Sequence, residues 1–177
     1  MTNTLYTYIN PANAITFSRF FTLYPFMQFM EKGEGQWAVV MAMLCGFLDL
    51  FDGMAARKFN CTSGFGEFFD AAADGICYGV MLSYLAWHGD LPWIPIVGIL
   101  ALGGVNTVGR LLYAKRIGKT TNYRSWAMER VVAFTIYLVG FGAMQVEAEF
   151  YAWACVSTMA FILVHDLKRM LIDPVPA

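Results

Sequence analysis

Long apolar stretches alternate with short polar loops along most of this chain. The stretches cover residues 14–30, 37–56, 64–87, 91–113, 125–144 and 150–164. Each approaches the ~20 residues that an α-helix needs to cross the hydrocarbon core of a bilayer. The pattern therefore predicts an all-α integral membrane protein with six transmembrane helices, the first of them kinked at Pro25. A short helix over residues 1–10 is expected at the level of the lipid headgroups.

Composition agrees with a membrane protein. The 177 residues are 58% hydrophobic and only 14% charged, whereas soluble domains carry roughly 25% charged residues. One domain is expected over residues 1–177. The formal net charge of −1 gives no reason to expect a nucleic-acid partner. The four cysteines have no CxxC spacing, so we expect them to be small buried packing residues.

The basic residues are distributed unevenly among the loops. Those of the second loop, the fourth loop and the tail are Arg57, Lys58, Lys115, Arg116, Lys119, Arg124, Lys168 and Arg169. The first, third and fifth loops contain only Lys32, together with several acidic residues. This asymmetry places the basic loops and both termini in the cytoplasm.

Four aspartates interrupt the apolar pattern around the predicted second loop. Residues 49–75 read DLFDGMAARKFNCTSGFGEFFDAAADG. Asp49 and Asp52 are three residues apart and Asp70 and Asp74 are four apart, so each pair shares one face of a helix. The intervening turn predicts a helical hairpin in which the two pairs face each other. Thr62 and Ser63, which precede the third apolar stretch, are candidates to cap its helix.

Carboxylates in a membrane helix are costly, so a functional role is the first hypothesis. Pairing with Arg or Lys is the alternative, but the membrane segments contain too few cations for four aspartates. Mg²⁺, which prefers oxygen ligands, would offset the charge. Such a site, with Arg57 beside it to clamp a phosphate, suggests phosphoryl chemistry. Gly53, Ala56, Gly64 and Gly66 would let a ligand or a neighbouring helix approach closely.

The spacing of these residues resembles a known signature. The pattern DxxDGxxAR, eight residues, GxxxDxxxD is matched at every fixed position, namely Asp49, Asp52, Gly53, Ala56, Arg57, Gly66, Asp70 and Asp74. It resembles the signature of the CDP-alcohol phosphotransferase family. The six-helix plan and the residues from Asn13 to Arg19 before the first helix are also similar to that family.

The resemblance implies a membrane enzyme that moves a phosphoalcohol group from a CDP-alcohol to a second alcohol and releases CMP. It implies two divalent ions, Mg²⁺ or Mn²⁺, bound by the four aspartates, with Asp70 and Asp74 catalytic and Asp74 as general base. The CDP-binding residues would be Asp49, Gly53, Ala56, Arg57 and Gly66. The implied donor is CDP-diacylglycerol, and the implied setting is a bacterial-type inner membrane, with the active site facing the cytoplasm and the enzyme a homodimer.

The second half of the chain should contain the acceptor site. The candidate contacts to an acceptor phosphate are Arg110, Lys115, Arg116 and Arg130. A basic pocket favours a phosphorylated polyol, glycerol 3-phosphate or inositol phosphate, over free serine. No feature typical of a serine transferase is seen. Two alternatives stay open: a CDP-choline or CDP-ethanolamine enzyme with diacylglycerol as acceptor, and a divalent-cation carrier, which would need no nucleotide cradle.

Overall fold

The computed structural model describes residues 10–61, 63–117 and 128–172, and in these ranges the chain is helical with no strand. The helices are α2 (Pro11–Ser18), η1 (Arg19–Thr22), α3 (Leu23–Glu31), α4 (Gly35–Lys58), α5 (Gly64–His88), α6 (Trp93–Ile117), α7 (Met128–Ala143) and α8 (Glu149–Ile172). The all-α prediction is confirmed. The first apolar stretch forms α2, η1 and α3, and each later stretch forms one helix. The headgroup helix expected over residues 1–10 falls almost wholly outside the described residues.

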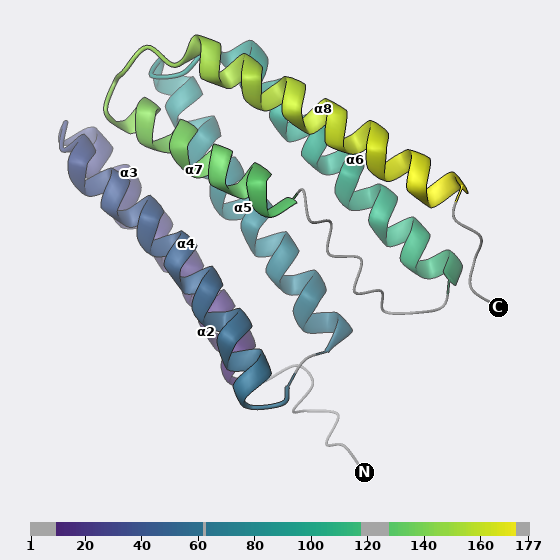
Figure 1. Cartoon of the computed structure of the whole chain (residues 1–177). Helices are drawn as coiled ribbons and strands as arrows, with labels where there is room; N and C mark the ends of the chain where they lie inside the picture. Colours follow the sequence, from purple (N-terminus) through teal and green to yellow (C-terminus); the bar gives the residue numbers. More distant parts are fainter. Residues whose placement is uncertain (1–9, 62, 118–127, 173–177) are drawn as a thin grey trace.

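Successive helices run up and down in one bundle (Figure 1). The connections 32–34, 89–92 and 144–148 lie at one end, while the turn 59–63 and the final residues of α6 and α8 lie toward the other. Helix α4 packs against α2, α3 and α7, α5 packs against α6 and α7, and α8 packs against α6. Within the described residues, the helix ends next to the basic loops therefore lie toward one end of the bundle.

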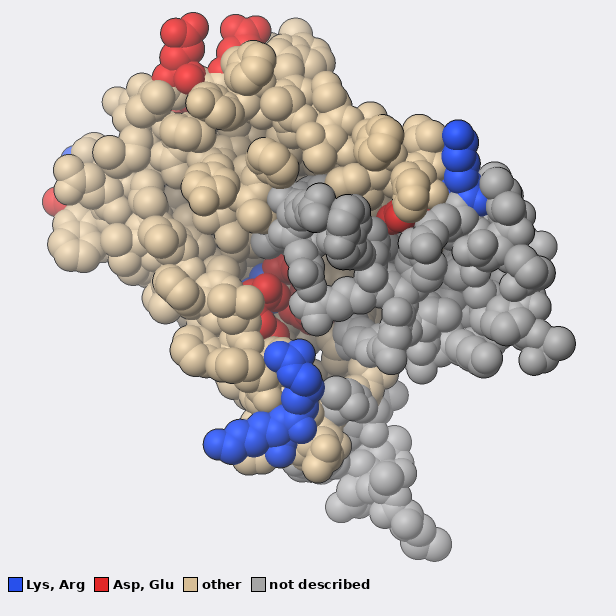
Figure 2. Space-filling model, in the orientation of Figure 1, with Lys and Arg blue, Asp and Glu red and all other residues tan. Residues whose placement is uncertain are grey.

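The exterior of the bundle is suited to lipid. Large apolar side chains face outward, among them Phe21, Leu112 and Phe161 at 69%, 63% and 74% exposure. The face shown in Figure 2 carries few charged side chains. An exposed apolar surface of this kind is typical of a membrane protein.

Length and hydropathy alone select two of the described helices as membrane spans, Gly35–Lys58 and Glu149–Lys168, with shorter apolar segments at Trp93–Gly109 and Ala133–Ala143. Helix α5 is long enough at 25 residues, but it contains Asp70 and Asp74. Polar residues of this kind lower the hydropathy of a helix even where they serve a site. Six crossings therefore remain a prediction, supported by the alternating helices.

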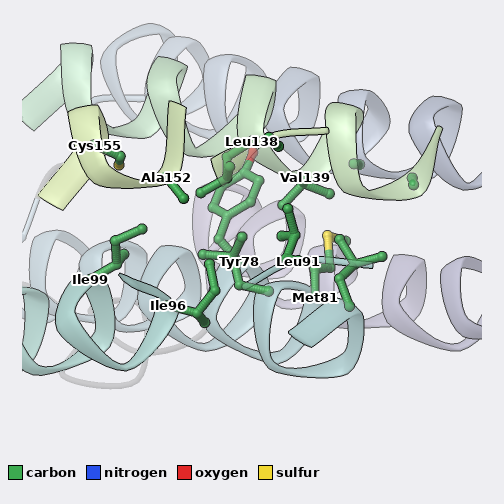
Figure 3. Close-up of a cluster of buried hydrophobic side chains, with 14 of the residues drawn as sticks. Tyr78, Met81, Leu91, Ile96, Ile99, Leu138, Val139, Ala152 and Cys155 are labelled. Atoms are coloured by element: carbon green, nitrogen blue, oxygen red, sulfur yellow. The ribbon is translucent and has the colours of Figure 1, made fainter. Parts of the chain in front are cut away.

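The apolar core extends from α3 and α4 to α8, and Figure 3 shows the part of it between α5, α6, α7 and α8. Tyr78 and Met81 project from α5 toward Leu138 and Val139 of α7. The four cysteines are free and buried, as predicted. This packing fixes α5 in the bundle, and α5 carries Asp70 and Asp74, two of the four aspartates of the predicted site.

The irregular turn of the first helix lies just before Pro25. Residues Arg19–Thr22 form a 3₁₀ turn, η1, between two α-helical segments. Proline lacks a backbone N–H, and its ring crowds the carbonyl four residues earlier, which here belongs to Phe21. The predicted kink thus falls one turn ahead of the proline, and it begins at Arg19.

Candidate functional site: an acidic cluster around Arg19

The predicted hairpin brings the two aspartate pairs together. Asn60, with φ of 50°, lies in the turn after α4. Ser63 then caps α5, because its Oγ accepts a hydrogen bond from the N–H of Gly66 over 3.0 Å. Asp49 and Asp52 lie in the second half of α4, and Asp70 and Asp74 lie in the first half of α5. The ends of α4 and α5 both pack against α2 and η1, and this arrangement brings the four carboxylates into one cluster.

All four aspartates meet the guanidinium group of Arg19. Its Nη1 donates to Asp70 Oδ1 over 2.9 Å and to Asp49 Oδ1 over 3.2 Å, and lies 3.7 Å from Asp52 Oδ2. Its Nη2 donates to Asp74 Oδ1. The Arg19 side chain is fully buried. The alternative of pairing with arginine therefore occurs in part, since one buried cation contacts all four aspartates, although its single charge does not match theirs.

The four carboxylates differ in exposure and in partners. Asp49, Asp70 and Asp74 offer oxygens that all lie within 4.8 Å of one another. Their side chains are 25%, 41% and 23% exposed, whereas that of Asp52 is 5% exposed. Asp52 also accepts a hydrogen bond from the hydroxyl of Thr16 over 2.7 Å. Three carboxylates thus face a common opening, and the fourth is held against α2.

Sequence reasoning missed Thr16 and Arg19 as site residues. They belong to a series of polar residues spaced three apart along α2 and η1: Asn10, Asn13, Thr16, Arg19 and Thr22. All five are buried. Polar residues at helical spacing in an apolar segment indicate a face turned away from lipid. This spacing could have identified Thr16 and Arg19 in the sequence. In the structure, both residues contact aspartates of α4.

The residues predicted to bind a nucleotide lie near the opening that Asp49, Asp70 and Asp74 face. The Arg57 guanidinium folds back over Gly53, where an added Cβ would lie 3.7 Å from Nη1. A Cβ at Gly66 would lie 3.2 Å from Asn13 Oδ1, so α2 approaches α5 closely there. Ala56 packs against a small cluster that includes Ala12 of α2. Figure 2 shows acidic side chains in a hollow with basic side chains near its rim.

The predicted acceptor contacts cannot be located in the same detail. Arg110, Lys115 and Arg116 belong to α6, and Arg130 belongs to α7. The side chains of all four lie outside the described residues, so their contribution to a site stays a prediction.

The donor set suits a hard divalent cation. It consists of carboxylate oxygens alone, which Mg²⁺ and Mn²⁺ prefer over nitrogen or sulfur. Asp49, Asp70 and Asp74 converge and remain partly open to the hollow. Their spacing lets one ion contact all three, and open access would let a phosphate oxygen join them.

Comparison with known proteins agrees with the family that the aspartate motif resembles. Residues 9–164 match the family model described as CDP-alcohol phosphatidyltransferase. A CDP-diacylglycerol–serine O-phosphatidyltransferase of Bacillus subtilis is 41% identical over 78 residues, 44% of this chain and 44% of the relative. A probable phosphatidylglycerophosphate synthase of Mycobacterium tuberculosis is 35% identical over 115 residues, 60% of this chain and 54% of the relative.

A phosphatidylinositol phosphate synthase of Streptomyces avermitilis is 31% identical over 121 residues, 64% of this chain and 48% of the relative. The chain spans about half the length of the curated relatives it matches. The relatives differ in the acceptor that their names imply. One of them is a serine enzyme, although this sequence shows no feature that we identify as typical of that class.

Proposed function

This chain belongs to the CDP-alcohol phosphatidyltransferase family, and we propose that it transfers the phosphatidyl group of CDP-diacylglycerol to the hydroxyl of a polar alcohol. The bond between the phosphatidyl phosphorus and CMP breaks, a bond to the acceptor oxygen forms, and CMP leaves. The observation that carries this proposal is the convergence of Asp49, Asp70 and Asp74 within 4.8 Å of one another.

The four aspartates have different roles, which follow from their different surroundings. Asp49, Asp70 and Asp74 hold divalent ions, with Asp52 completing the set beside Thr16. When bound, Mg²⁺ or Mn²⁺ supplies positive charge to the pyrophosphate oxygens. Asp74 accepts the proton of the acceptor hydroxyl as general base. Its side chain is 23% exposed, so the carboxyl group is partly accessible.

The nucleotide half of the donor lies over the end of α4. The Arg57 side chain is exposed and lies over Gly53, so its guanidinium can donate paired hydrogen bonds to phosphate. Asp49, Ala56 and Gly66 form the remaining walls, and small residues allow the cytidine to approach the backbone.

A phosphorylated polyol is the acceptor we favour. Arg110, Lys115, Arg116 and Arg130 give α6 and α7 a basic character toward the end where α4 carries Arg57. Guanidinium and ammonium groups favour a phosphate dianion over zwitterionic serine. The names of the Mycobacterium and Streptomyces relatives imply glycerol phosphate and inositol phosphate acceptors.

The membrane setting follows from the charges. We place the acidic cluster and both termini on the cytoplasmic side of a bacterial-type inner membrane, because the basic loops share that end. The acyl chains of the donor would then enter from the lipid. A homodimer is part of the same proposal and rests on the family alone.

The test is a donor and acceptor panel on the purified protein. CDP-diacylglycerol is supplied with Mg²⁺ or Mn²⁺ and with glycerol 3-phosphate, inositol phosphate or serine, and CMP and lipid products are measured by mass spectrometry. The expected result is CMP together with a phosphatidyl product of a phosphorylated polyol. A product with serine alone would overturn the choice of acceptor.

Two further arms test the other activities. Turnover of CDP-choline with diacylglycerol, and not of CDP-diacylglycerol, would assign the aminoalcohol reaction. Mn²⁺ flux into liposomes without any CMP formation would assign a cation carrier.

A further inference from the structure

We propose that Arg19 is a built-in counter-ion that holds the acidic cluster together and competes with the divalent ion for the same carboxylate oxygens. The proposal rests on the proposed function only in expecting such an ion. Arg19 lies on η1, outside the DxxDGxxAR segment, and makes contacts that a topology marker or a lipid-facing arginine would not make.

The hydrogen bonds of Arg19 go to the three converging carboxylates. Nη1 and Nη2 donate to one oxygen each of Asp49, Asp70 and Asp74, the three residues whose oxygens lie within 4.8 Å. Its Nε is buried and has no hydrogen-bond partner. A buried guanidinium with an unused donor is placed by charge more than by hydrogen-bond satisfaction.

Charge explains why this position needs a cation. Four carboxylates packed between two helices repel one another, and in a low-dielectric setting that repulsion is strong. One guanidinium that contacts all four offsets part of it and allows α4 and α5 to pack on the η1 segment that carries Arg19. The α2–η1 segment thereby contributes to the site although it lacks a carboxylate.

The same geometry makes the arginine a competitor of a metal ion. A divalent ion bound by Asp49, Asp70 and Asp74 requires the oxygens that Arg19 now contacts, and two cations on one set of oxygens repel. Metal binding therefore includes displacement of the guanidinium. Each cation weakens the binding of the other by the same factor, as linkage requires.

The test measures Mn²⁺ affinity and thermal unfolding of the purified full chain without nucleotide or lipid substrate. Arg19→Gln should bind Mn²⁺ about 5-fold to 150-fold more tightly than wild type, the usual range for coupled sites. In EDTA it should unfold at a lower temperature than wild type, and Mn²⁺ should restore more of its stability. Lys58→Gln is the matched control, since it removes an exposed cation from the same end of the bundle and should change neither quantity.

Arg19→Lys keeps the test decisive if Arg19→Gln does not fold. A lysine ammonium is a point charge without the planar fork of arginine, so it should compete less well. We expect Arg19→Lys to bind Mn²⁺ more tightly than wild type and to lose less stability in EDTA than Arg19→Gln. Unchanged or weaker Mn²⁺ binding by the folded Arg19 variants would overturn the proposal. Failure of the proposed reaction would instead appear as absent CMP, with these metal titrations unaffected.

Discussion

At the scale of single residues, the site depends on buried groups that partner one another. Asp52 is the least exposed of the four aspartates, and the Thr16 hydroxyl donates to it. A buried carboxylate that loses a donor is destabilised because water cannot replace the lost bond. Thr16 therefore matters for the shape of the cluster, although it carries no charge.

Thr16→Val tests this role. The substitution keeps the side-chain shape and removes the donor to Asp52, so we expect a loss of stability of about 1–3 kcal/mol and a lower rate of CMP formation. Thr158→Val is the control, because the hydroxyl of Thr158 donates to the Ala154 carbonyl of its own helix. Equal losses in both variants, measured by thermal unfolding, would contradict a special role for Thr16.

The residue-level prediction from sequence was uneven for a physical reason. The four aspartates could be found because carboxylates are rare in apolar segments and their spacing put each pair on one helix face. Arg19 could not be assigned to them, since its segment lies 30 residues before Asp49 and its partners depend on how the helices pack.

At the scale of helices, small residues set how closely the bundle packs. Gly142 of α7 faces α5 and the loop after it, where an added Cβ would lie 2.8 Å from Leu91 Cγ and 2.9 Å from Leu85 Cδ1. Two residues earlier, an added Cβ at Gly140 would meet nothing within 4 Å. The two glycines of one helix therefore have different roles.

Gly142→Ala should lower stability by about 1–3 kcal/mol through overpacking. Gly140→Ala should be neutral or stabilising by up to ~1 kcal/mol, because alanine favours the helix. Thermal unfolding in the same detergent compares the two variants. A Gly142→Ala protein as stable as Gly140→Ala would show that α7 does not pack against Leu85 and Leu91 as described.

The contact between α2 and α5 makes a second prediction at this scale. Gly66→Ala would press on Asn13 Oδ1 at 3.2 Å and Ser63 Oγ at 3.3 Å, at the mouth of the proposed nucleotide site. We expect a higher KM for CDP-diacylglycerol with a smaller change in kcat. Gly104→Ala, which meets nothing within 4 Å, serves as the control. An unchanged KM would argue against Gly66 as part of the nucleotide wall.

Helix positions were predicted well from sequence, and local geometry less well. Apolar length and polar loops located the described helices because a membrane-spanning segment must satisfy its own backbone hydrogen bonds. Pro25 indicated a kink, but its placement at Arg19–Thr22 depends on which carbonyl the ring crowds. Arg19 is the first residue of this 3₁₀ turn, so the position of its side chain depends on where the kink falls.

At the scale of the whole molecule, the alternating helices give a testable orientation. Lys58→Cys should react with a membrane-impermeant maleimide only from the cytoplasmic side, and Glu147→Cys only from the opposite side. The native cysteines are buried and should stay unlabelled in the folded wild type, which is the control. Labelling of both engineered sites from one side would rule out the proposed topology.

The central claim is that the aspartate cluster performs metal-dependent cleavage of a CDP-linked lipid. The most direct measurement is the rate of CMP release from CDP-diacylglycerol by Asp74→Asn beside Asp90→Asn, whose carboxylate lies at the far end of the bundle. Loss of the general base should lower the rate by about 10²-fold to 10⁴-fold, while Asp90→Asn stays within about twofold of wild type, a change far smaller than that loss. CMP release by Asp74→Asn at the wild-type rate would contradict the proposed chemistry.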